Sequence, residues 1–406
     1  MANLKTVLIL GAGVYQVPLI REAKRRNYRT IVASIPGNYP GFSLADKVYY
    51  TDTTNREEIL KIAKAERIDA ITTTGTDVAI SSVGYVCSEL GLNGINYETA
   101  KILTDKALMK DAFVKGGVST SRFCRIHTAK DVEISADIIG YPVVLKIVDK
   151  SGSRGIIKID KRNQINEAYR KAKEYTNSDY MVVEKYVEGV EIGIDALVQN
   201  GELKMIIPHG KFVCQSDGSI IPIGHYCPMT CSSRLYKNIE SETIKIIEST
   251  GINNCAVNID AFVLPNEDIS IIEAAGRCGA TGIPEVISSY TNRDYYGCIL
   301  DCALDINVDS FRIIDGKPTA SILIFSPITG ILRSINYCYN GVTYVNREIN
   351  IEGIIQVNFD VSPGEMVHKI QNGTNRIGMA IIKTDSYENL KEAVASFRDS
   401  IKIIVE

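Results

Sequence analysis

Apolar and polar positions alternate with two different periods along the first 95 residues. The short apolar runs "KTVLIL", "YRTIVAS" and "DAITTTG" each predict a strand. The segments "VYQVPLIREAKRRN", "NREEILKIAKAERI" and a further stretch that ends at "SEL" predict helices, and Asn55 with Glu58 forms a capping-box pattern before the second. This alternation predicts an N-terminal doubly wound, mainly parallel sheet domain over residues 1–95.

The middle of the chain carries longer strand patterns and hairpins. "TDKALMKDAFVKGGV" predicts a helix that Thr104 caps and that Gly116–Gly117 ends. Strands are expected at "YPVVLKIV", "GIIKID" and "YMVVEKYV", with the helix "NQINEAYRKAKEYT" before the third. The Asn200–Gly201 turn within "VEIGIDALVQNGELKMIIP" predicts a hairpin. From about residue 320, short strands and turns indicate a small mixed C-terminal lobe.

The run "DAFVLPNEDISIIEAAGRC", residues 260–278, predicts a hairpin with a carboxylate on each arm. Its polar turn "PNED" suggests a register that pairs Leu264 with Ile269, Phe262 with Ile271 and Asp260 with Glu273. Directly opposed residues have Cβ atoms roughly 4.5–5.5 Å apart, where like charges destabilise a sheet. The hairpin therefore needs a cation, a shared proton or another register, although exposed acidic pairs also occur at hairpin ends.

Lys146 lies inside the apolar run "PVVLKIV", where a charge is unfavourable unless it is paired or bound to an anion. The loop "DKSGSRG" follows at once, with Ser151, Gly152, Ser153 and Gly155. Glycines let backbone N–H groups approach an anion, and serines add donors. A phosphate clamp and an ordinary hairpin loop beside an edge lysine are both consistent with this pattern.

The turn "GAGVYQ" after the first strand resembles part of a dinucleotide-binding motif. Gly11 and Gly13 match, but Gln16 stands where the third glycine would be, and the second strand ends without an acidic residue for a ribose. A tight strand–helix turn or a small-substrate contact is therefore favoured over NAD binding.

The composition of the chain argues against a nucleic-acid-binding protein and against a membrane protein. The chain has 406 residues, 45% of them hydrophobic, and a net charge of −3, which gives no electrostatic argument for nucleic acid or an anionic membrane. No apolar run reaches about 18 residues, so no membrane-spanning helix is expected. The N-terminus passes directly into the first strand, so the cysteines are expected to be reduced in a cytoplasmic protein.

Histidine and cysteine add little catalytic chemistry. The four histidines leave few bases to activate a nucleophilic cysteine, and "HYCPMTC" does not have the spacing of a common zinc site. His209 and His225 match no motif; either could touch substrate, but a solvated or hydrogen-bonded position in a loop is favoured.

The ordered series "TDK", "YPVVLK", a Gly/Ser loop, "EKYVEGVE", "NIDAF" and "IIEAAGR" resembles the ATP-grasp superfamily of carboxylate–amine ligases. The resemblance implies three parts: the N-terminal domain, an ATP-grasp domain over 96–320 with subdomains 96–180 and 181–320, and a closing lobe over 321–406. The C-terminal "VSPGEMV" and "RIGMAIIKTDSYENLKEAV" resemble the L-amino-acid-ligase-like and biotin-carboxylase-like branches. The implied fold class is α/β and α+β.

The resemblance also implies roles for residues. Lys106 and Lys146 would hold the ATP phosphates, and the loop with Ser151, Gly152, Ser153 and Gly155 would cover them. The remaining ATP contacts would come from Glu184 and the backbone of Lys185 and Val187 to adenine, and from Glu191 to the ribose. Magnesium, or alternatively manganese, would bind Asp260 and Glu273, and Arg277 would face the transferred phosphoryl group or the substrate carboxylate.

The sequence departs from the ATP-grasp pattern at the implied metal site: Ala275 stands where the superfamily often has asparagine. The expected register places Asn258 opposite Ala275, so we hypothesise that Asn258 supplies the missing amide oxygen to the metal.

The implied reaction joins a carboxylate, activated by ATP as an acyl phosphate, to an amine, with amino-acid-like substrates. A carboxylase that activates bicarbonate and a nucleotide-binding regulatory protein without catalysis are the alternatives. Small-molecule carboxylate and amine substrates and a homodimer are expected, and neither nucleic acid nor membrane is expected as a partner.

Overall fold

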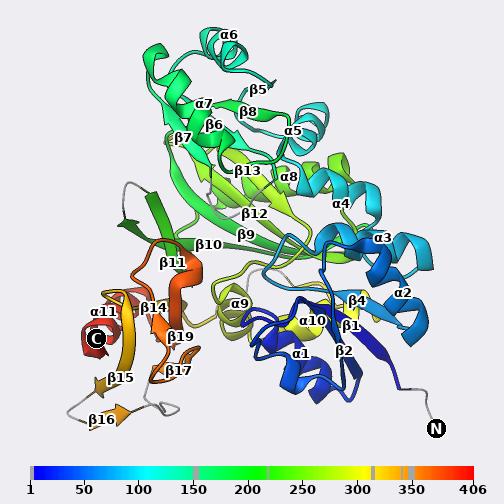
Figure 1. The fold of residues 1–406 in the computed structure, drawn as a ribbon, viewed down its shortest axis with the longest axis vertical. Helices are drawn as coiled ribbons and strands as arrows, with labels where there is room; N and C mark the ends of the chain where they lie inside the picture. The colour runs from blue at the N-terminus through cyan, green and yellow to red at the C-terminus, as the bar shows by residue number, and fades with distance from the viewer. Residues whose placement is uncertain (1–3, 150–154, 217–218, 312–315, 340–341, 346–352) are drawn as a thin grey trace. The chain divides into compact units, whose positions relative to one another are not determined.

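The computed structural model describes residues 4–149, 155–216, 219–311, 316–339, 342–345 and 353–406. The chain divides into two compact units (Figure 1). The larger unit comprises residues 1–206, 231–277 and 299–310, and the smaller unit comprises residues 207–230, 278–298 and 311–406. Each unit contains a hydrophobic cluster of its own.

The N-terminal part of the larger unit is a parallel sheet with the strand order β3–β2–β1–β4. Its strands are β1 (Thr6–Leu10), β2 (Arg29–Ser34), β3 (Lys47–Tyr50) and β4 (Ala70–Thr72). Its helices are α1 (Val17–Arg25), α2 (Arg56–Glu66) and α3 (Ile80–Leu90). Every residue of β1 is buried, as is typical of the parallel strands in α/β proteins. The expected doubly wound sheet is confirmed.

The turn after β1 is filled by the side chain of Gln16. Gln16 Oε1 accepts a hydrogen bond from the Gly13 N–H at 3.0 Å, and Gln16 Nε2 donates to the carbonyl oxygen of Thr74. A Cβ atom at Gly11, whose φ is +96°, would lie 2.9 Å from this side chain. The glutamine therefore ties the turn to the loop after β4, which supports the interpretation of "GAGVYQ" as a tight strand–helix turn.

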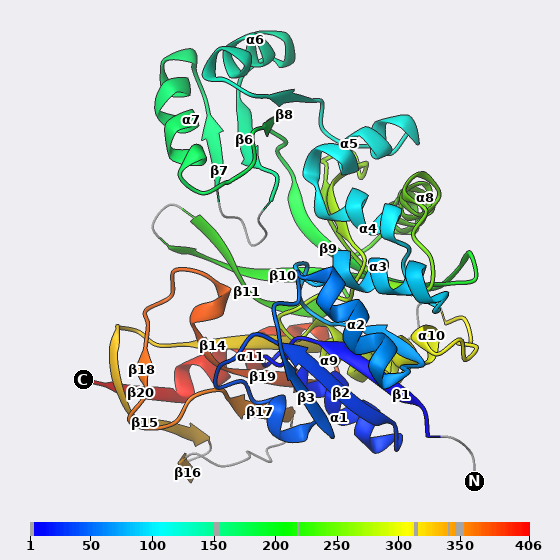
Figure 2. The same ribbon diagram turned by 45° about the vertical axis from the view of Figure 1, so that its right-hand side comes forward.

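A second sheet of the larger unit is antiparallel, with the order β5–β8–β6–β7. Its strands are β5 (Phe123–Ile126), β6 (Val143–Ile147), β7 (Ile156–Ile159) and β8 (Met181–Lys185). Two helices, α6 (Ala129–Ile139) and α7 (Ile165–Lys173), pack together against it (Figure 2). Thr128 and Asp131 cap α6 reciprocally, which satisfies backbone donors at its start.

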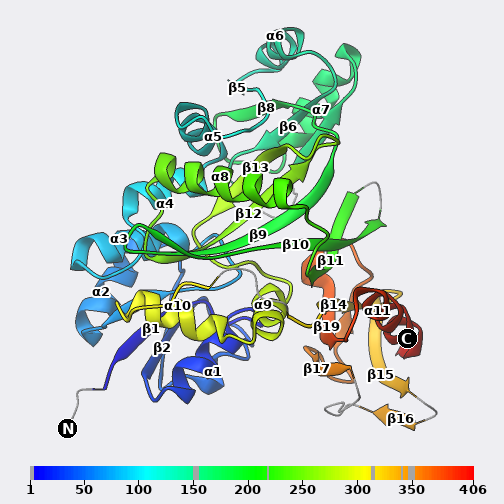
Figure 3. The ribbon, with the colours of Figure 1, turned by 180° about the vertical axis from the view of Figure 1, so that it is seen from behind.

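A third group of strands in the larger unit is antiparallel and carries the acidic hairpin. Its neighbouring strands are β13 (Ile269–Ala275), β12 (Cys255–Val263) and β9 (Val190–Gln199). The helices beside it are α4 (Tyr97–Thr104), α5 (Lys106–Lys115) and α8 (Ser233–Thr250), and α8 runs across β12 and β13 in Figure 3. The predicted cap of α5 is wrong: Asp105 Oδ1 accepts from the N–H groups of Ala107 and Leu108, while Thr104 ends α4.

The smaller unit combines antiparallel strands with two helices. Its strands are β11 (Ser219–Cys227), β14 (Thr319–Phe325), β15 (Gly330–Tyr339), β16 (Val342–Val345), β17 (Ile354–Phe359), β18 (Met366–Val367), β19 (Arg376–Lys383) and β20 (Ile401–Val405). Its helices are α9 (Ile283–Thr291) and α11 (Tyr387–Ser400). β10 (Glu202–Ser216) and α10 (Tyr295–Ala303) contribute residues to both units.

Short 3₁₀ turns occupy Phe42–Leu44, Arg162–Gln164 and Gly373–Asn375. Among the described residues, no helix combines the length and the apolar character that a membrane crossing requires.

Replacing Gln16 by alanine should lower the free energy of unfolding by about 1–3 kcal/mol, because the buried carbonyl of Thr74 and the partly buried N–H of Gly13 would lose their partner. Chemical denaturation measures this change. The matched control is Arg21→Ala, an exposed position of the same helix, which should leave the transition in place. A Gln16→Ala transition that coincides with the wild-type one would show that the glutamine does not hold the turn.

Candidate active site

The acidic hairpin has the expected register at its charged end. Asp260 pairs with Glu273 and Asn258 pairs with Ala275, as predicted. The register near the turn was wrong, because Phe262 pairs with Ser270 and Val263 with Ile269.

A β-bulge accounts for this difference. The register shifts between Asp260 and Ala261, so that Ile272 is the extra residue on β13. The bulge returns the two carboxylates to opposed positions although the pairing nearer the turn is shifted by one residue from the predicted register.

Strand β9 extends the same face on the other side of β12. Gly193 pairs with Asp260, and Asp195 pairs with Asn258. Because directly paired residues point to the same side of a sheet, two adjacent rows form. One row is Gly193, Asp260 and Glu273, and the other is Asp195, Asn258 and Ala275.

Lys106 provides the positive partner of the hairpin. It is the first residue of α5, and its Nζ lies 2.8 Å from Glu273 Oε2. Lys106 lowers the pKa of Glu273 to about 2, although burial acts in the opposite direction. Burial alone would lower the pKa of Lys106, but Glu273 raises it above its ordinary value. Both groups are therefore charged at pH 7.

Two further lysines converge on a single carboxylate oxygen. Glu184 Oε2 on β8 lies 3.0 Å from Lys146 Nζ on β6 and 3.1 Å from Lys110 Nζ on α5. Burial would raise the pKa of the Glu184 carboxyl, but Lys146 and Lys110 lower it to about 2. Burial lowers the pKa of Lys110 to about 8 against the attraction of Glu184. The structure thus adds Lys110 to the residues of the candidate site, because the sequence motifs did not include it.

Arg277 is held by an acidic side chain and an amide. Its Nε and Nη2 both lie 2.7 Å from Asp77 Oδ1, and its Nη1 donates to Asn258 Oδ1 at 3.1 Å. Asn258 Nδ2 in turn donates to Asp195 Oδ2 at 2.8 Å. Because a guanidinium only donates and an ionised carboxylate only accepts, these partners fix the orientation of the amide.

These charged groups form one electrostatic cluster within the larger unit. The pKa of Glu273 responds to Lys106 first, and also to Lys146 and Arg277. The pKa of Lys106 also responds to Asp77 and Glu184. The residues that sequence motifs placed around the ATP phosphates are therefore close enough to interact.

The residues assigned to adenine and ribose lie near β8 and β9. The Lys185 N–H donates to Arg122 O at 2.8 Å, and Lys185 Nζ donates to the carbonyl oxygens of Gly140 and Tyr141. Val187 lies between the two strands, and Glu191 pairs with Phe262 in the β9–β12 ladder. An adenine contact from the Lys185 backbone would therefore use its carbonyl oxygen.

Of the predicted Gly/Ser loop residues, Gly155 lies among the described residues. Ser151, Gly152 and Ser153 lie outside the described residues. Gly155 has a φ of +66°, and a Cβ there would lie 2.7 Å from Ile147 Cδ1, so glycine is required at this position.

The hairpin offers the ligand chemistry that magnesium prefers. Asp260 and Glu273 supply carboxylate oxygens, and Asn258 supplies an amide oxygen, all hard donors. Within the described residues, no group of three or more histidine, cysteine or acidic side chains is positioned to hold a metal. A divalent ion here would thus need other oxygen donors, which the phosphates of a nucleotide could supply.

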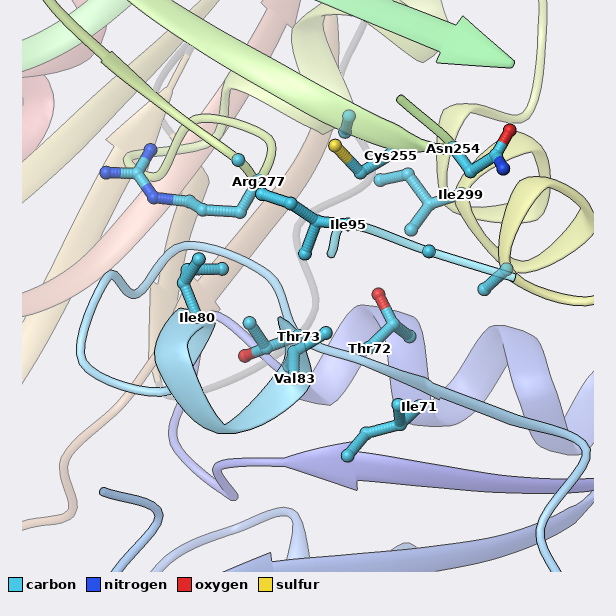
Figure 4. A pocket seen from close by; sticks show the side chains of 14 residues that line it. Ile71, Thr72, Thr73, Ile80, Val83, Ile95, Asn254, Cys255, Arg277 and Ile299 are labelled. Carbon is cyan, nitrogen blue, oxygen red and sulfur yellow. The ribbon is translucent and has the colours of Figure 1, made fainter. Parts of the chain in front are cut away.

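A small hollow of about 20 Å³ lies beside the cluster in the larger unit (Figure 4). Its lining is largely aliphatic and includes Ile71, Ile80, Ile95 and Ile299. The guanidinium of Arg277 points away from these side chains in Figure 4. The hollow therefore does not contain the charged groups, and we assign it no role in nucleotide binding.

His209 and His225 are not loop residues, contrary to expectation. They are buried on β10 and β11, and their Nδ1 atoms lie 3.2 Å apart. Burial lowers the pKa of His225 well below its ordinary value, and His209 and Lys211 add to the effect. His225 is therefore neutral at pH 7, and the pair is hydrogen-bonded inside the smaller unit.

Family models and known proteins match parts of this chain. The family model of the ATP-grasp domain matches residues 139–285, and that of the L-amino acid ligase C-terminal domain 2 matches residues 340–406. Alanine–anticapsin ligase of Bacillus subtilis (strain 168) is 26% identical over 253 residues, which are 57% of this chain and 53% of that protein. The matched part is thus about half of that relative's length.

Two solved structures match the whole chain. Phosphoribosylglycinamide synthetase from Anaerococcus prevotii has a TM-score of 0.84 and 28% identity, with 100% of both chains covered. The L-amino acid ligase from Bacillus licheniformis has a TM-score of 0.82 and 17% identity, again with 100% of both chains covered.

The chain therefore contains an ATP-grasp domain, the class of fold that sequence motifs indicated. Its residues 340–406 match the C-terminal domain 2 of L-amino acid ligases, and its relatives include an L-arginine-specific L-amino acid ligase of Bacillus subtilis, 23% identical over 350 residues. The resemblance stated from the sequence is confirmed. The family uses ATP and magnesium.

The lowered pKa of Glu184 predicts a defined loss of stability in acid. The carboxyl titrates near 4.5 when unfolded and near pH 2 when folded, so the unfolded chain binds more protons between these values. The stabilisation is complete above about pH 4.5 and is lost as the pH falls toward 2. Chemical denaturation at several pH values should show this decline, and Glu184→Gln should reduce its slope. An identical slope in both proteins would contradict the assignment.

Proposed function

We propose that the protein is an ATP-dependent ligase that activates a carboxylate as an acyl phosphate and joins it to an amine, with amino-acid-like substrates. The observation that carries the proposal is the convergence of two lysines, the buried Lys110 and the partly buried Lys146, on one carboxylate oxygen, Glu184 Oε2. One negative charge cannot neutralise two ammonium groups, so the group of Glu184, Lys110 and Lys146 has a local surplus of positive charge that suits an anionic ligand. Phosphates supply that anion.

In this proposal each end of ATP has its own residues. Lys106 and Lys146 bind the phosphates, and the loop with Ser151, Gly152, Ser153 and Gly155 covers them. Adenine lies against Glu184, Lys185 and Val187, and Glu191 accepts from the ribose hydroxyls. Phosphoryl transfer depends mainly on positioning and charge neutralisation, so cations and donors matter more than a nucleophilic side chain.

Magnesium would be held by Asp260, Glu273 and Asn258, where it neutralises charge that develops on the phosphates. Arg277 would bind the substrate carboxylate or the transferred phosphoryl group. The Asp77 carboxylate supports this role, because it fixes two guanidinium nitrogens at 2.7 Å and so holds the group in one orientation. The remaining Nη1 contact to Asn258 links the arginine to the acidic hairpin.

We also propose that residues 1–95, 96–320 and 321–406 are the functional domains, with 96–180 and 181–320 as the ATP-grasp subdomains. We further propose a cytoplasmic homodimer that takes small-molecule carboxylate and amine substrates; the action of the ligase homologues on small molecules supports the substrate class. Manganese could replace magnesium at the same oxygen ligands.

Phosphate release from ATP, measured with magnesium across a panel of amino acids and amines with and without bicarbonate, tests the function. We expect release that requires an amino acid together with an amine. Release that depends on bicarbonate would indicate a carboxylase instead. ATP binding without turnover under every condition would indicate a regulatory protein.

Lys146→Ala should reduce the rate by about 10²-fold or more, because the lost charge stabilises the transition state. The matched control is Lys171→Ala, which removes an exposed lysine of an i,i+4 pair on α7. A Lys146→Ala protein that is folded and has the wild-type rate would contradict the phosphate-site assignment.

Asn258→Ala should raise the magnesium concentration at half-maximal rate by about tenfold, if the amide oxygen contributes to the metal site. A titration of rate against magnesium measures this. An unchanged magnesium dependence with a raised KM for the carboxylate would show that Asn258 only supports Arg277.

A further inference from the structure

We propose that Lys110 is a positioning residue that retains the Glu184 carboxylate, so that Lys146 can turn from this carboxylate to a phosphate of ATP. The proposal rests on ATP binding as the proposed function. It concerns a lysine outside the motifs that indicated the ATP site.

Lys110 is fixed in place by contacts from three directions. It follows Lys106 by four residues, and therefore lies on the same face of α5. Its Nζ donates to Thr120 Oγ1 at 2.6 Å and to Ser121 Oγ at 3.1 Å, and it lies 3.1 Å from Glu184 Oε2. An ammonium group has three donors, so these contacts satisfy Lys110 completely.

The two hydroxyls are themselves anchored. Thr120 Oγ1 donates to the carbonyl oxygen of Ile271 on β13 at 2.7 Å, and Ser121 Oγ donates to Glu184 Oε2 at 2.8 Å. Lys110 therefore belongs to a network that connects α5, β8 and the acidic hairpin. Its side chain is only 2% exposed, which leaves it no access to a ligand in solution.

Lys146 differs from Lys110 in its exposure and in its place in the fold. Its side chain is 12% exposed, and its Nζ donates a hydrogen bond to Glu184 Oε2 at 3.0 Å. It lies in β6, the strand that leads directly into the Gly/Ser loop. Of the two lysines on Glu184, Lys146 is thus the one that can reach an incoming phosphate.

Charge compensation explains why both lysines are needed. The Glu184 side chain is 4% exposed, and a buried carboxylate that loses its only cation is strongly destabilised. If Lys146 were the only cation on Glu184, the carboxylate would compete with phosphate for it. With Lys110 in place, Glu184 keeps a cation when Lys146 turns to the nucleotide.

Nucleotide affinities of four proteins test this inference without turnover: the wild type, Lys110→Met, Glu184→Gln and the double variant. Calorimetry with a non-hydrolysable ATP analogue and magnesium gives each affinity, and AMP is the matched ligand that lacks the outer phosphates. Lys110→Met should weaken the ATP analogue by about tenfold and change AMP binding by less than about threefold. In the Glu184→Gln background the same substitution should change ATP-analogue affinity by less than about threefold, because no carboxylate remains to retain Lys146.

The outcomes separate this inference from the proposed function. Equal losses in both backgrounds would mean a merely structural role, and no loss in either would mean no role; both results overturn the inference while ATP binding stands. A wild-type protein that does not bind the ATP analogue overturns the proposed function and the inference with it. Thermal unfolding verifies that each variant is folded, and Lys110→Arg, which keeps the charge, should restore most of the affinity.

Discussion

The candidate site depends on one constraint: a charge removed from water must be matched by an opposite charge or by a ligand. Asp77 matches Arg277, and Glu273 matches Lys106. Glu184 differs from these two pairs, because two lysines contact its one carboxylate. This local surplus of positive charge is the basis for proposing an anion beside Lys146, the more exposed of the two lysines.

Backbone geometry brings these charges together from distant parts of the chain. Asp105 caps α5 and starts the helix at Lys106, so that Lys106 and Lys110 lie one turn apart on the same side. The antiparallel ladder places Lys146 and Glu184 on adjacent strands, and the bulge at Ile272 keeps Glu273 opposite Asp260. The cap of α5, the pairing of β6 with β8 and the bulge in β13 thus determine the positions of the charged groups that the proposed chemistry requires.

Local patterns predicted much of this from the sequence, and the failures have physical reasons. The period of two placed Asp260 opposite Glu273, but a bulge adds a residue without changing composition, so the pairs near the turn were wrong. Thr104 and Asp105 are both good caps, and only the start of α5 distinguishes them. Lys110 was missed, although a lysine beside Met109 and three residues before Phe113, both buried, was a usable signal. His209 and His225 have no local pattern that reveals burial on two paired strands.

The most direct test is a crystal structure with magnesium and a non-hydrolysable ATP analogue. The account predicts that Lys146 Nζ contacts a phosphate oxygen, that Lys110 remains on Glu184, and that the metal lies between Asp260 and Glu273. A nucleotide bound away from these residues, or phosphates that leave Lys146 on Glu184, would contradict it.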